Sequence, residues 1–170
     1  MKKILILNTG GTISMSEDHT TGKVSPTENN PIGIGGDIFS HMAHIYMENL
    51  YNLPSPHITE FEMFELKQRI MQAIEEGYEG VVVTHGTDTL EETAYYLELT
   101  LDVNIPIVIT GAMRSSNEIG ADGLANLRSS LVVAVSDESR DKGVLVVMND
   151  EAHTATYVTK THTTNVATFQ

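Results

Sequence analysis

Four short runs of apolar residues recur along the chain, each bounded by glycine, asparagine, threonine or proline. These runs are Ile4–Leu7, Val81–Val83, Ile107–Ile109 and Val144–Met148. Unbroken apolar runs of this length are typical of strands that are buried on both faces of a parallel sheet. A weaker run with partial alternation, Ile45–Leu53, predicts one more strand.

Helical patterns lie between these strands. Apolar residues recur on one stripe of Phe61–Glu76, and Gly77 follows as an end signal. Similar patterns predict helices over Leu90–Leu101 and Leu124–Val135, and a short one is expected over Gly36–His44. Strands that alternate with such helices imply right-handed crossovers. The predicted fold class is therefore α/β, a three-layer, doubly wound, mostly parallel sheet with flavodoxin-like strand order.

Two segments stand outside this alternation. Residues 13 to 32 carry glycine, proline, serine, threonine and asparagine with little periodicity, which predicts a long loop or mobile hairpin. Residues 149 to 170 are rich in threonine and hold no second core.

Composition narrows the possible functions. A length of 170 residues corresponds to about one domain. The formal charge of −13 disfavours nucleic acid and anionic lipid as partners. The lack of cysteine excludes disulfides, thiolate nucleophiles and cysteine zinc sites.

The amino-terminal pattern bears on localisation. Only four apolar residues precede Asn8, too few for a signal peptide, and no stretch approaches the length of a membrane span. We therefore expect a cytoplasmic protein, with the periplasm as the alternative if a leader was removed.

The unusual residues follow the predicted strands. In open α/β sheets, ligands bind outside the carboxyl ends of the strands. The segments found there are Thr9-Gly10-Gly11-Thr12, His85-Gly86-Thr87-Asp88-Thr89, Gly111-Ala112-Met113-Arg114 and Val158-Thr159-Lys160-Thr161.

The first of these segments allows three interpretations. Gly10-Gly11 can simply form a tight turn, or its amides can cradle a phosphate, although the full phosphate-loop patterns are absent. Alternatively, Thr12 is a nucleophile beside a backbone oxyanion hole.

The segment His85–Thr89 and Lys160 can have separate structural roles or one joint catalytic role. Thr89 and Glu92 fit a capping box, and Asp88 suits a helix amino terminus. Lys160 alone would be a solvated surface residue. A threonine hydroxyl needs a nearby base, however, and an amine held by a carboxylate can supply it, which gives a relay of threonine, Lys160 and Asp88.

The histidines do not indicate a metal site. His41, His44, His57 and His85 form no metal-binding pattern, so they are expected to be exposed or satisfied in the core.

The four segments, in this order and at these separations, resemble the amino-terminal domain of the bacterial L-asparaginase family (asparaginase/glutaminase type). The two longest signatures are Ile6–Ser14 and Gly80–Leu90, and Gly143–Asp150 is similar to a further family segment. The amino-acid sequence of Leu90–Tyr96 is most similar to the type II branch of the family. The resemblance covers essentially the whole chain.

The resemblance implies roles for individual residues. Thr12 resembles the nucleophile that forms the acyl-enzyme, while Thr87, Lys160 and Asp88 resemble the group that assists proton transfer and activates water. Asp88 would also meet the substrate ammonium, and Ser55 its α-carboxylate, although Pro56 and His57 replace the usual Gln-Asp. Substrate contacts are also implied for Gly11, Gly86 and Ala112. Alignment on residues 22–24 puts His19 where the family has a loop tyrosine, so His19 is a candidate proton acceptor.

The implied reaction is hydrolysis of asparagine to aspartate and ammonia, without metal or cofactor. Rival interpretations are a preference for glutamine, the amidase subunit of a tRNA-amidating enzyme, and a non-catalytic ligand-binding domain of doubly wound type.

The resemblance also predicts how the protein is organised. Residues 1–150 would be the amino-terminal catalytic domain, residues 151–170 its end or the start of a linker, and the family's carboxy-terminal domain is absent from this chain. Full-length family members are expected to be homotetramers. The 170-residue fragment is expected to be inactive and prone to self-association.

Overall fold

A computed structural model describes residues 1–17, 20, 24–26 and 38–170. Among them, six strands form one sheet in the order β4-β1-β5-β6-β7-β8. The first five strands in this order are mutually parallel, and β8 pairs with β7 in the antiparallel direction. The strand bounds are β1 Lys3–Asn8, β4 His44–Asn49, β5 Gly80–Thr84, β6 Ile107–Thr110, β7 Val144–Met148 and β8 Glu151–Thr154.

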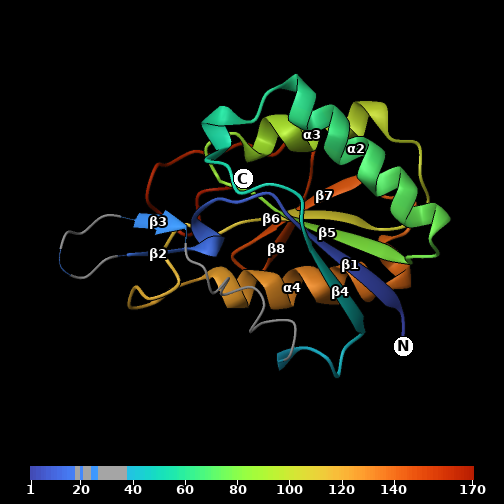
Figure 1. The fold of residues 1–170 in the computed structure, drawn as a ribbon, viewed down its shortest axis with the longest axis horizontal. Coiled ribbons are helices and arrows are strands. Elements are labelled where there is room, and N and C mark those ends of the chain that lie inside the picture. Colours follow the sequence, from blue (N-terminus) through green and yellow to red (C-terminus); the bar gives the residue numbers. More distant parts are fainter. Residues whose placement is uncertain (18–19, 21–23, 27–37) are drawn as a thin grey trace.

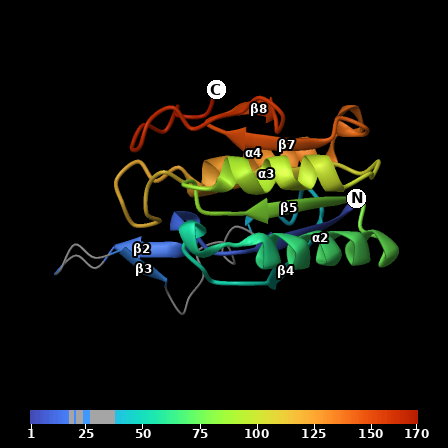
Figure 2. The same cartoon turned by 90° about the horizontal axis from the view of Figure 1, so that it is seen from above.

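Helices cover both faces of this sheet. Helices α2 (Glu60–Glu75) and α3 (Leu90–Thr100) lie on one face, and α4 (Gly123–Val135) lies on the other (Figure 1). The short strands β2 (Met15–Glu17) and β3 (Val24–Pro26) form an antiparallel pair. This pair protrudes from the edge of the sheet where the parallel strands end (Figure 2).

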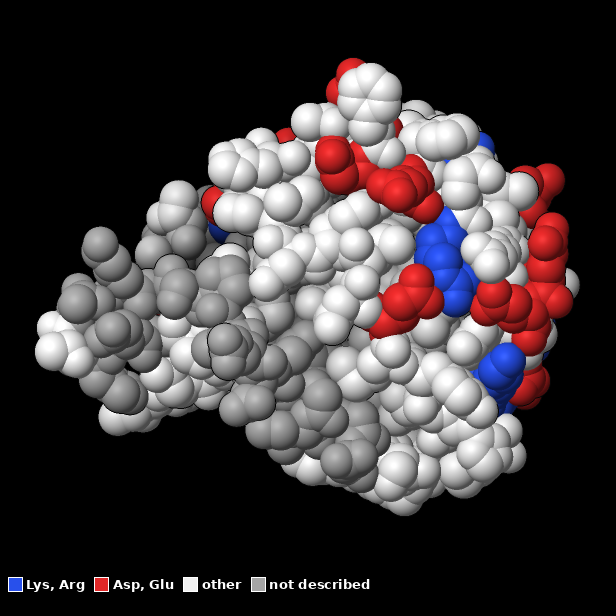
Figure 3. All heavy atoms as spheres, in the orientation of Figure 1, with Lys and Arg blue, Asp and Glu red and all other residues white. Residues whose placement is uncertain are grey.

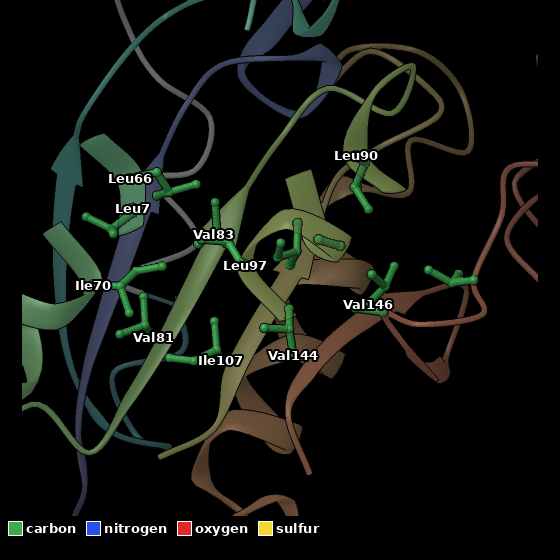
Figure 4. Close-up of a cluster of buried hydrophobic side chains, with 14 of the residues drawn as sticks. Leu7, Leu66, Ile70, Val81, Val83, Leu90, Leu97, Ile107, Val144 and Val146 are labelled. Atoms are coloured by element: carbon green, nitrogen blue, oxygen red, sulfur yellow. The ribbon is translucent and has the colours of Figure 1, made fainter. Parts of the chain in front are cut away.

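The core has two parts because successive side chains of a strand point to opposite faces. Figure 4 shows the larger part, where strand residues such as Val81 and Val83 meet Leu66 and Ile70 of α2 and Leu97 of α3. The smaller part lies under α4, where Ile4, Ile6, Val82, Val108 and Val147 pack against Leu127 and Leu131. Burial on both faces explains why the strands appear in the sequence as unbroken apolar runs.

Acidic side chains outnumber basic ones in this chain, 23 to 10. Figure 3 shows them gathered toward the α2 side of one face, with basic side chains between them. On the helix, Arg69 binds both Glu48 and Glu76, at nitrogen–oxygen distances of 2.9 and 3.1 Å.

The predicted fold class is confirmed, and the order β4-β1-β5-β6-β7 is the flavodoxin-like order. The antiparallel edge strand β8 lay in the threonine-rich segment and was not predicted, because its exposed residues give no hydrophobic signal. The hairpin alternative for residues 13 to 32 agrees with the β2–β3 pair.

The short helix expected over residues 36–44 is only partly testable, since residues 36 and 37 lie outside the described residues. From Ile38 the chain turns, with the amide of Met42 donating to the carbonyl of Phe39 at 2.9 Å, and β4 already begins at His44. The carboxyl half of that predicted helix is therefore wrong.

Candidate active site

Three turns pack closely, backbone against backbone, at the carboxyl edge of the sheet. A β-carbon on Gly11, whose φ is +83°, would overlap with the backbone nitrogen and Cα of Gly86. A β-carbon on Gly86 would in turn lie 2.7 Å from the side chain of Ser55. After β6, a β-carbon on Gly111 would lie 2.5 Å from the carbonyl oxygen of His85. Glycine at these positions is what lets the segments after β1, β5 and β6 converge on one place.

Thr12 follows directly from the first of these turns. It begins a 3-10 turn over Thr12–Ser14, capped at its start by Gly11. The amide and hydroxyl of Ser14 both donate to the carbonyl of Gly11, at 3.0 and 2.9 Å. The turn thereby fixes the backbone on both sides of Thr12, whose half-buried side chain lines a cleft.

This cleft has a volume of about 410 Å³ and is built by all of the strand-end segments. Its lining residues are Gly11, Thr12, Met15, Pro54, Ser55, Pro56, Gly86, Thr87, Asp88, Met113, Ser115, Glu118, Lys160 and Thr163. The cleft thus combines three threonine and two serine hydroxyls, one ammonium and two carboxylates with backbone from two glycine turns.

Lys160 contacts the second signature directly. Its Nζ lies 2.9 Å from Oγ1 of Thr87 and 2.8 Å from Oδ1 of Asp88. The Lys160 side chain is 13% exposed, whereas that of Asp88 is 67% exposed. The ammonium is therefore held inside the protein, while the carboxylate also faces solvent and can take a second cationic partner.

The segment that carries Lys160 folds back on itself. Lys160 forms an isolated bridge with Phe169, and the amide of Thr161 donates to the carbonyl of Thr168 at 2.7 Å. Phe169 packs into the core under α3, and Thr168 is fully buried. This packing brings a residue near the end of the described chain to the edge of the central strands.

His85 fixes the turn that precedes Thr87. Its Nδ1 lies 2.8 Å from the carbonyl oxygen of Gly86, and its Nε2 lies 2.8 Å from Oγ1 of Thr93. Since a carbonyl only accepts, Nδ1 carries the proton, and Nε2 accepts from the Thr93 hydroxyl. Burial lowers the pKa of His85 to about 4. His85 is therefore a buried histidine with both ring nitrogens hydrogen-bonded, which is one of the two outcomes that the sequence predicted for the histidines.

The turn that carries Ser55 is tied to the same region. The hydroxyl of Thr89 donates to the carbonyl of Ser55 at 2.8 Å and makes no cap bond to its own helix. The capping box predicted for Thr89 and Glu92 is therefore wrong, because a tertiary partner takes the hydroxyl. The capping box of this structure lies on α2, between Thr59 and Glu62.

The loop after β6 is shaped by two polar residues near the start of α4. The carboxylate of Asp122 accepts from the amides of Met113 and Arg114, each with a contact of 3.0 Å. Asn126 donates to the carbonyl of Gly111 at 3.0 Å and accepts from the amide of Asn149 at 2.9 Å. These bonds turn the chain so that the loop faces the cleft.

Most of the predicted site residues come together in this cleft. Gly11, Thr12, Ser55, Gly86, Thr87, Asp88 and Lys160 all line it. Ala112 does not, since its side chain is buried in the core under α4 and the next residue, Met113, lines the cleft instead. His19 lies outside the described residues.

Met113 lies in a segment that the sequence singled out, but Ser115 and Glu118, which also line the cleft, were not predicted. They follow β6, so the rule that ligands bind at carboxyl ends could have drawn attention to them. Met15 and Thr163 carried no comparable signal.

Within the described part of the chain, no group of three or more histidine, aspartate or glutamate side chains could hold a metal ion. Over the same residues, no helix is both long and apolar enough to cross a membrane.

Comparison with known proteins decides the family. The family model described as "Asparaginase, N-terminal" matches residues 3–170. The chain belongs to the asparaginase family. This confirms the resemblance on which the residue assignments were based.

Relatives in this family come from several bacteria. The chain is 40% identical to L-asparaginase 2 of Bacillus subtilis (strain 168) and 41% identical to L-asparaginase 2 of Escherichia coli (strain K12). All of this chain is covered in both comparisons, but only 47% and 49% of the relatives. It is also 35% identical to the glutaminase-asparaginase of Pseudomonas fluorescens biotype A, over 94% of this chain and 46% of the relative. The chain therefore spans about half the length of the curated relatives it matches.

The fold agrees with a solved asparaginase-family structure. The crystal structure of a probable cytoplasmic L-asparaginase from Campylobacter jejuni superposes with a TM-score of 0.89 at 37% identity. The match covers 99% of this chain and 51% of that protein.

Proposed function

We propose that this chain carries the catalytic residues of an L-asparaginase, which hydrolyses L-asparagine to L-aspartate and ammonia through an acyl-enzyme on Thr12. The observation that carries the proposal is the placement of the Lys160 ammonium on both Thr87 and Asp88, in a cleft that Thr12 also lines. A phosphate or nucleotide site has no need of a lysine engaged by a threonine and an aspartate in this way.

In the first step, the Thr12 hydroxyl attacks the carbonyl carbon of the substrate's side-chain amide. Its proton passes to a base, and His19 is the proposed acceptor. Negative charge develops on the amide oxygen, and the backbone amides of the Gly11 and Gly86 turns are suitable donors for it. When the tetrahedral intermediate collapses, the C–N bond breaks, the nitrogen takes the proton that the base had accepted and ammonia leaves, which produces an ester on Thr12.

In the second step, water hydrolyses this ester. Thr87, Lys160 and Asp88 form the group that activates this water and assists its proton transfer, and the proton that the water loses ends on the Thr12 oxygen as the ester is cleaved. Attack on the ester carbonyl then releases aspartate and restores the Thr12 hydroxyl.

Substrate binding follows from charge and position. The exposed face of the Asp88 carboxylate is suited to the substrate's α-ammonium, and Ser55, which also lines the cleft, to its α-carboxylate. Ala112 is proposed to contribute through its backbone, since its side chain is buried.

Glutamine is a second candidate substrate, because one relative of this chain is a glutaminase-asparaginase. The two candidates are separated by the ratio of kcat/KM for asparagine and glutamine, measured as ammonia release.

The organisation of the protein is also a proposal. Residues 1–150 constitute the catalytic domain and residues 151–170 its end, and a second domain completes the active enzyme. The full-length protein is proposed to be a homotetramer. A cytoplasmic location is proposed because the solved relative is named a probable cytoplasmic L-asparaginase. Residues 1–170 alone are proposed to self-associate.

The test is mass spectrometry of the full-length protein, quenched rapidly after mixing with asparagine. We expect an aspartyl adduct on the peptide that contains Thr12, and no adduct in Thr12→Ala. Thr163→Ala, which alters another threonine that lines the cleft, is the matched control and should keep the adduct. Near-normal turnover by Thr12→Ala would overturn the assignment.

His19 has a separate test. If it accepts the proton, activity should fall as the pH drops through about 6.5, the ordinary histidine range. An unchanged rate and pH profile in His19→Ala would exclude this role.

A further inference from the structure

The carboxylate of Glu91 holds the main chain at Lys160. One oxygen, Oε2, accepts the backbone N–H of Lys160, and the other, Oε1, accepts the hydroxyl of Thr159 at 3.1 Å. Glu91 lies in the first turn of α3, only three residues after Asp88. Among the residues that line the cleft Glu91 does not appear, so it acts from behind the site.

Lys160 is therefore held at both ends by one short segment. Thr87 and Asp88 contact its Nζ, and Glu91 contacts its backbone nitrogen. The three partners fall within five consecutive residues, across a separation of about 70 positions from Lys160 in the chain. Because a lysine side chain has four rotatable bonds, the position of its ammonium depends on where its backbone is held. Hydrogen bonds to an ionised acceptor are the stronger kind, which suits this task.

Other contacts keep the segment folded without Glu91. Thr159 and Gln170 exchange two backbone hydrogen bonds, of 2.9 and 3.1 Å. Phe169 is 2% exposed and anchors the returning segment in the core. Loss of Glu91 should thus loosen the placement of Lys160 without unfolding the segment.

We propose that Glu91 is a positioning residue that sets the Lys160 ammonium against Thr87 and Asp88. Its consequence for catalysis rests on the proposed asparaginase function, but the placement itself is measurable without turnover.

The variants separate hydrogen bonding from charge. Glu91→Ala removes both contacts. Glu91→Gln removes the charge, yet its amide oxygen can accept the Lys160 N–H and its amide nitrogen can donate to the Thr159 hydroxyl. Glu92→Ala is the matched control, because Glu92 is an exposed acid in the same helical turn and its loss has the same effect on the helix dipole.

The first measurement is competitive acetylation of the lysines with acetic anhydride, read by peptide mass spectrometry. Lys142, which is exposed, is the internal reference, and Lys160 should react slowly because its side chain is 13% exposed. In Glu91→Ala we expect the reactivity of Lys160 relative to Lys142 to rise about tenfold, the effect of losing a hydrogen bond to a charged group. Glu91→Gln should stay within about twofold of the wild type, and Glu92→Ala should match it.

The second measurement, made on the full-length protein, is the separate determination of kcat and KM for asparagine. Glu91→Ala should lower kcat about tenfold and leave KM within about twofold, because substrate-binding groups are untouched. Glu91→Gln should restore most of kcat.

The outcomes distinguish the two proposals. If the full-length protein releases no ammonia but Glu91→Ala still exposes Lys160, the proposed function fails and the positioning role stands. If a folded Glu91→Ala protein shows unchanged Lys160 reactivity, the positioning role is wrong whatever the activity. Should Glu91→Ala not fold, Glu91→Asp replaces it, since its shorter carboxylate should raise Lys160 reactivity by about threefold, and no rise would overturn the proposal.

Discussion

His85 remains neutral in the folded protein at pH values where an exposed histidine is protonated. Burial lowers its pKa to about 4, and its two ring nitrogens are used to hold Gly86 and Thr93. The unfolded chain, with an ordinary histidine pKa near 6.5, binds a proton first as the pH falls. The contribution of neutral, buried His85 to the free energy of unfolding is therefore complete above about pH 6.5 and is lost as the pH falls toward 4.

We expect the free energy of unfolding of the wild type to fall by about 2 kcal/mol from this group alone between pH 7 and pH 5. Urea unfolding at a series of pH values measures it. His85→Gln should flatten this part of the profile, whereas His57→Gln, which alters an exposed histidine, should not. A profile for His85→Gln that parallels the wild type would contradict the assignment.

Gly11 and Gly77 are two glycines with positive φ. Their φ values are +83° and +81°, but the ψ of Gly11 is 178°, a combination essentially confined to glycine, so alanine is strained at both positions and more so at Gly11. A β-carbon on Gly11 would also overlap with Gly86, whereas one on Gly77 has nothing within 4 Å.

Gly77→Ala should therefore cost about 1–2 kcal/mol, the strain of a left-handed residue. Gly11→Ala should cost at least about 2 kcal/mol more, because the turns after β1 and β5 must separate. Thermal and urea unfolding of both variants measure the difference. Equal decreases in the free energy of unfolding for the two variants would mean that the close approach of these turns does not make Gly11→Ala more destabilising.

Helix α4 does more than cover a face of the sheet, since its first turns also shape the loop after β6. Asn126 is 2% exposed and joins three backbone or carboxylate groups, the carbonyl of Gly111, the carboxylate of Asp122 and the amide of Asn149. Without Asn126, the carbonyl of Gly111 and the amide of Asn149 would lose these partners.

Asn126→Ala should lower the free energy of unfolding by about 2–4 kcal/mol, since buried polar groups lose their partners. It should also disturb the loop that carries Met113 and Ser115 into the cleft. Asn104→Ala, at an exposed position, is the control and should change stability by less than about 0.5 kcal/mol. Chemical denaturation gives both values, and a loss of under 1 kcal/mol in Asn126→Ala would show that water replaces the side chain.

The molecule as a whole has a continuous sheet with a core on each face. These two cores give residues 1–170 the means to fold as one cooperative unit. Its matched relatives are about twice as long, however, so the chain corresponds to only part of their machinery.

We therefore expect residues 1–170 to unfold in a single cooperative transition and to release little or no ammonia from asparagine. If the second domain supplies a charged contact to the substrate, its absence reduces binding by about 2–5 kcal/mol, and a site left open to water loses further rate. Calorimetry and an ammonia assay at high asparagine test both statements. Turnover comparable to a full-length relative would show that this half is sufficient.

Local sequence was enough to place most helices and strands and to choose the class of fold. The buried strands appear as apolar runs because both of their faces are covered, and that pattern is local. The convergence of Thr12, Thr87 and Asp88 was also predictable, since each follows a parallel strand and such strands end at one edge. Lys160 was assigned from the chemistry that a threonine requires and from the family resemblance.

Contacts between segments far apart in the chain could not be predicted in this way. Nothing near Thr89 indicates that its hydroxyl bonds to Ser55 in place of capping its own helix. Nothing near Glu91 indicates that it holds the main chain at Lys160. A polar side chain can form hydrogen bonds of similar energy with several nearby groups, so tertiary packing decides which bond forms. Apolar runs, in contrast, must be buried in any compact arrangement of this chain.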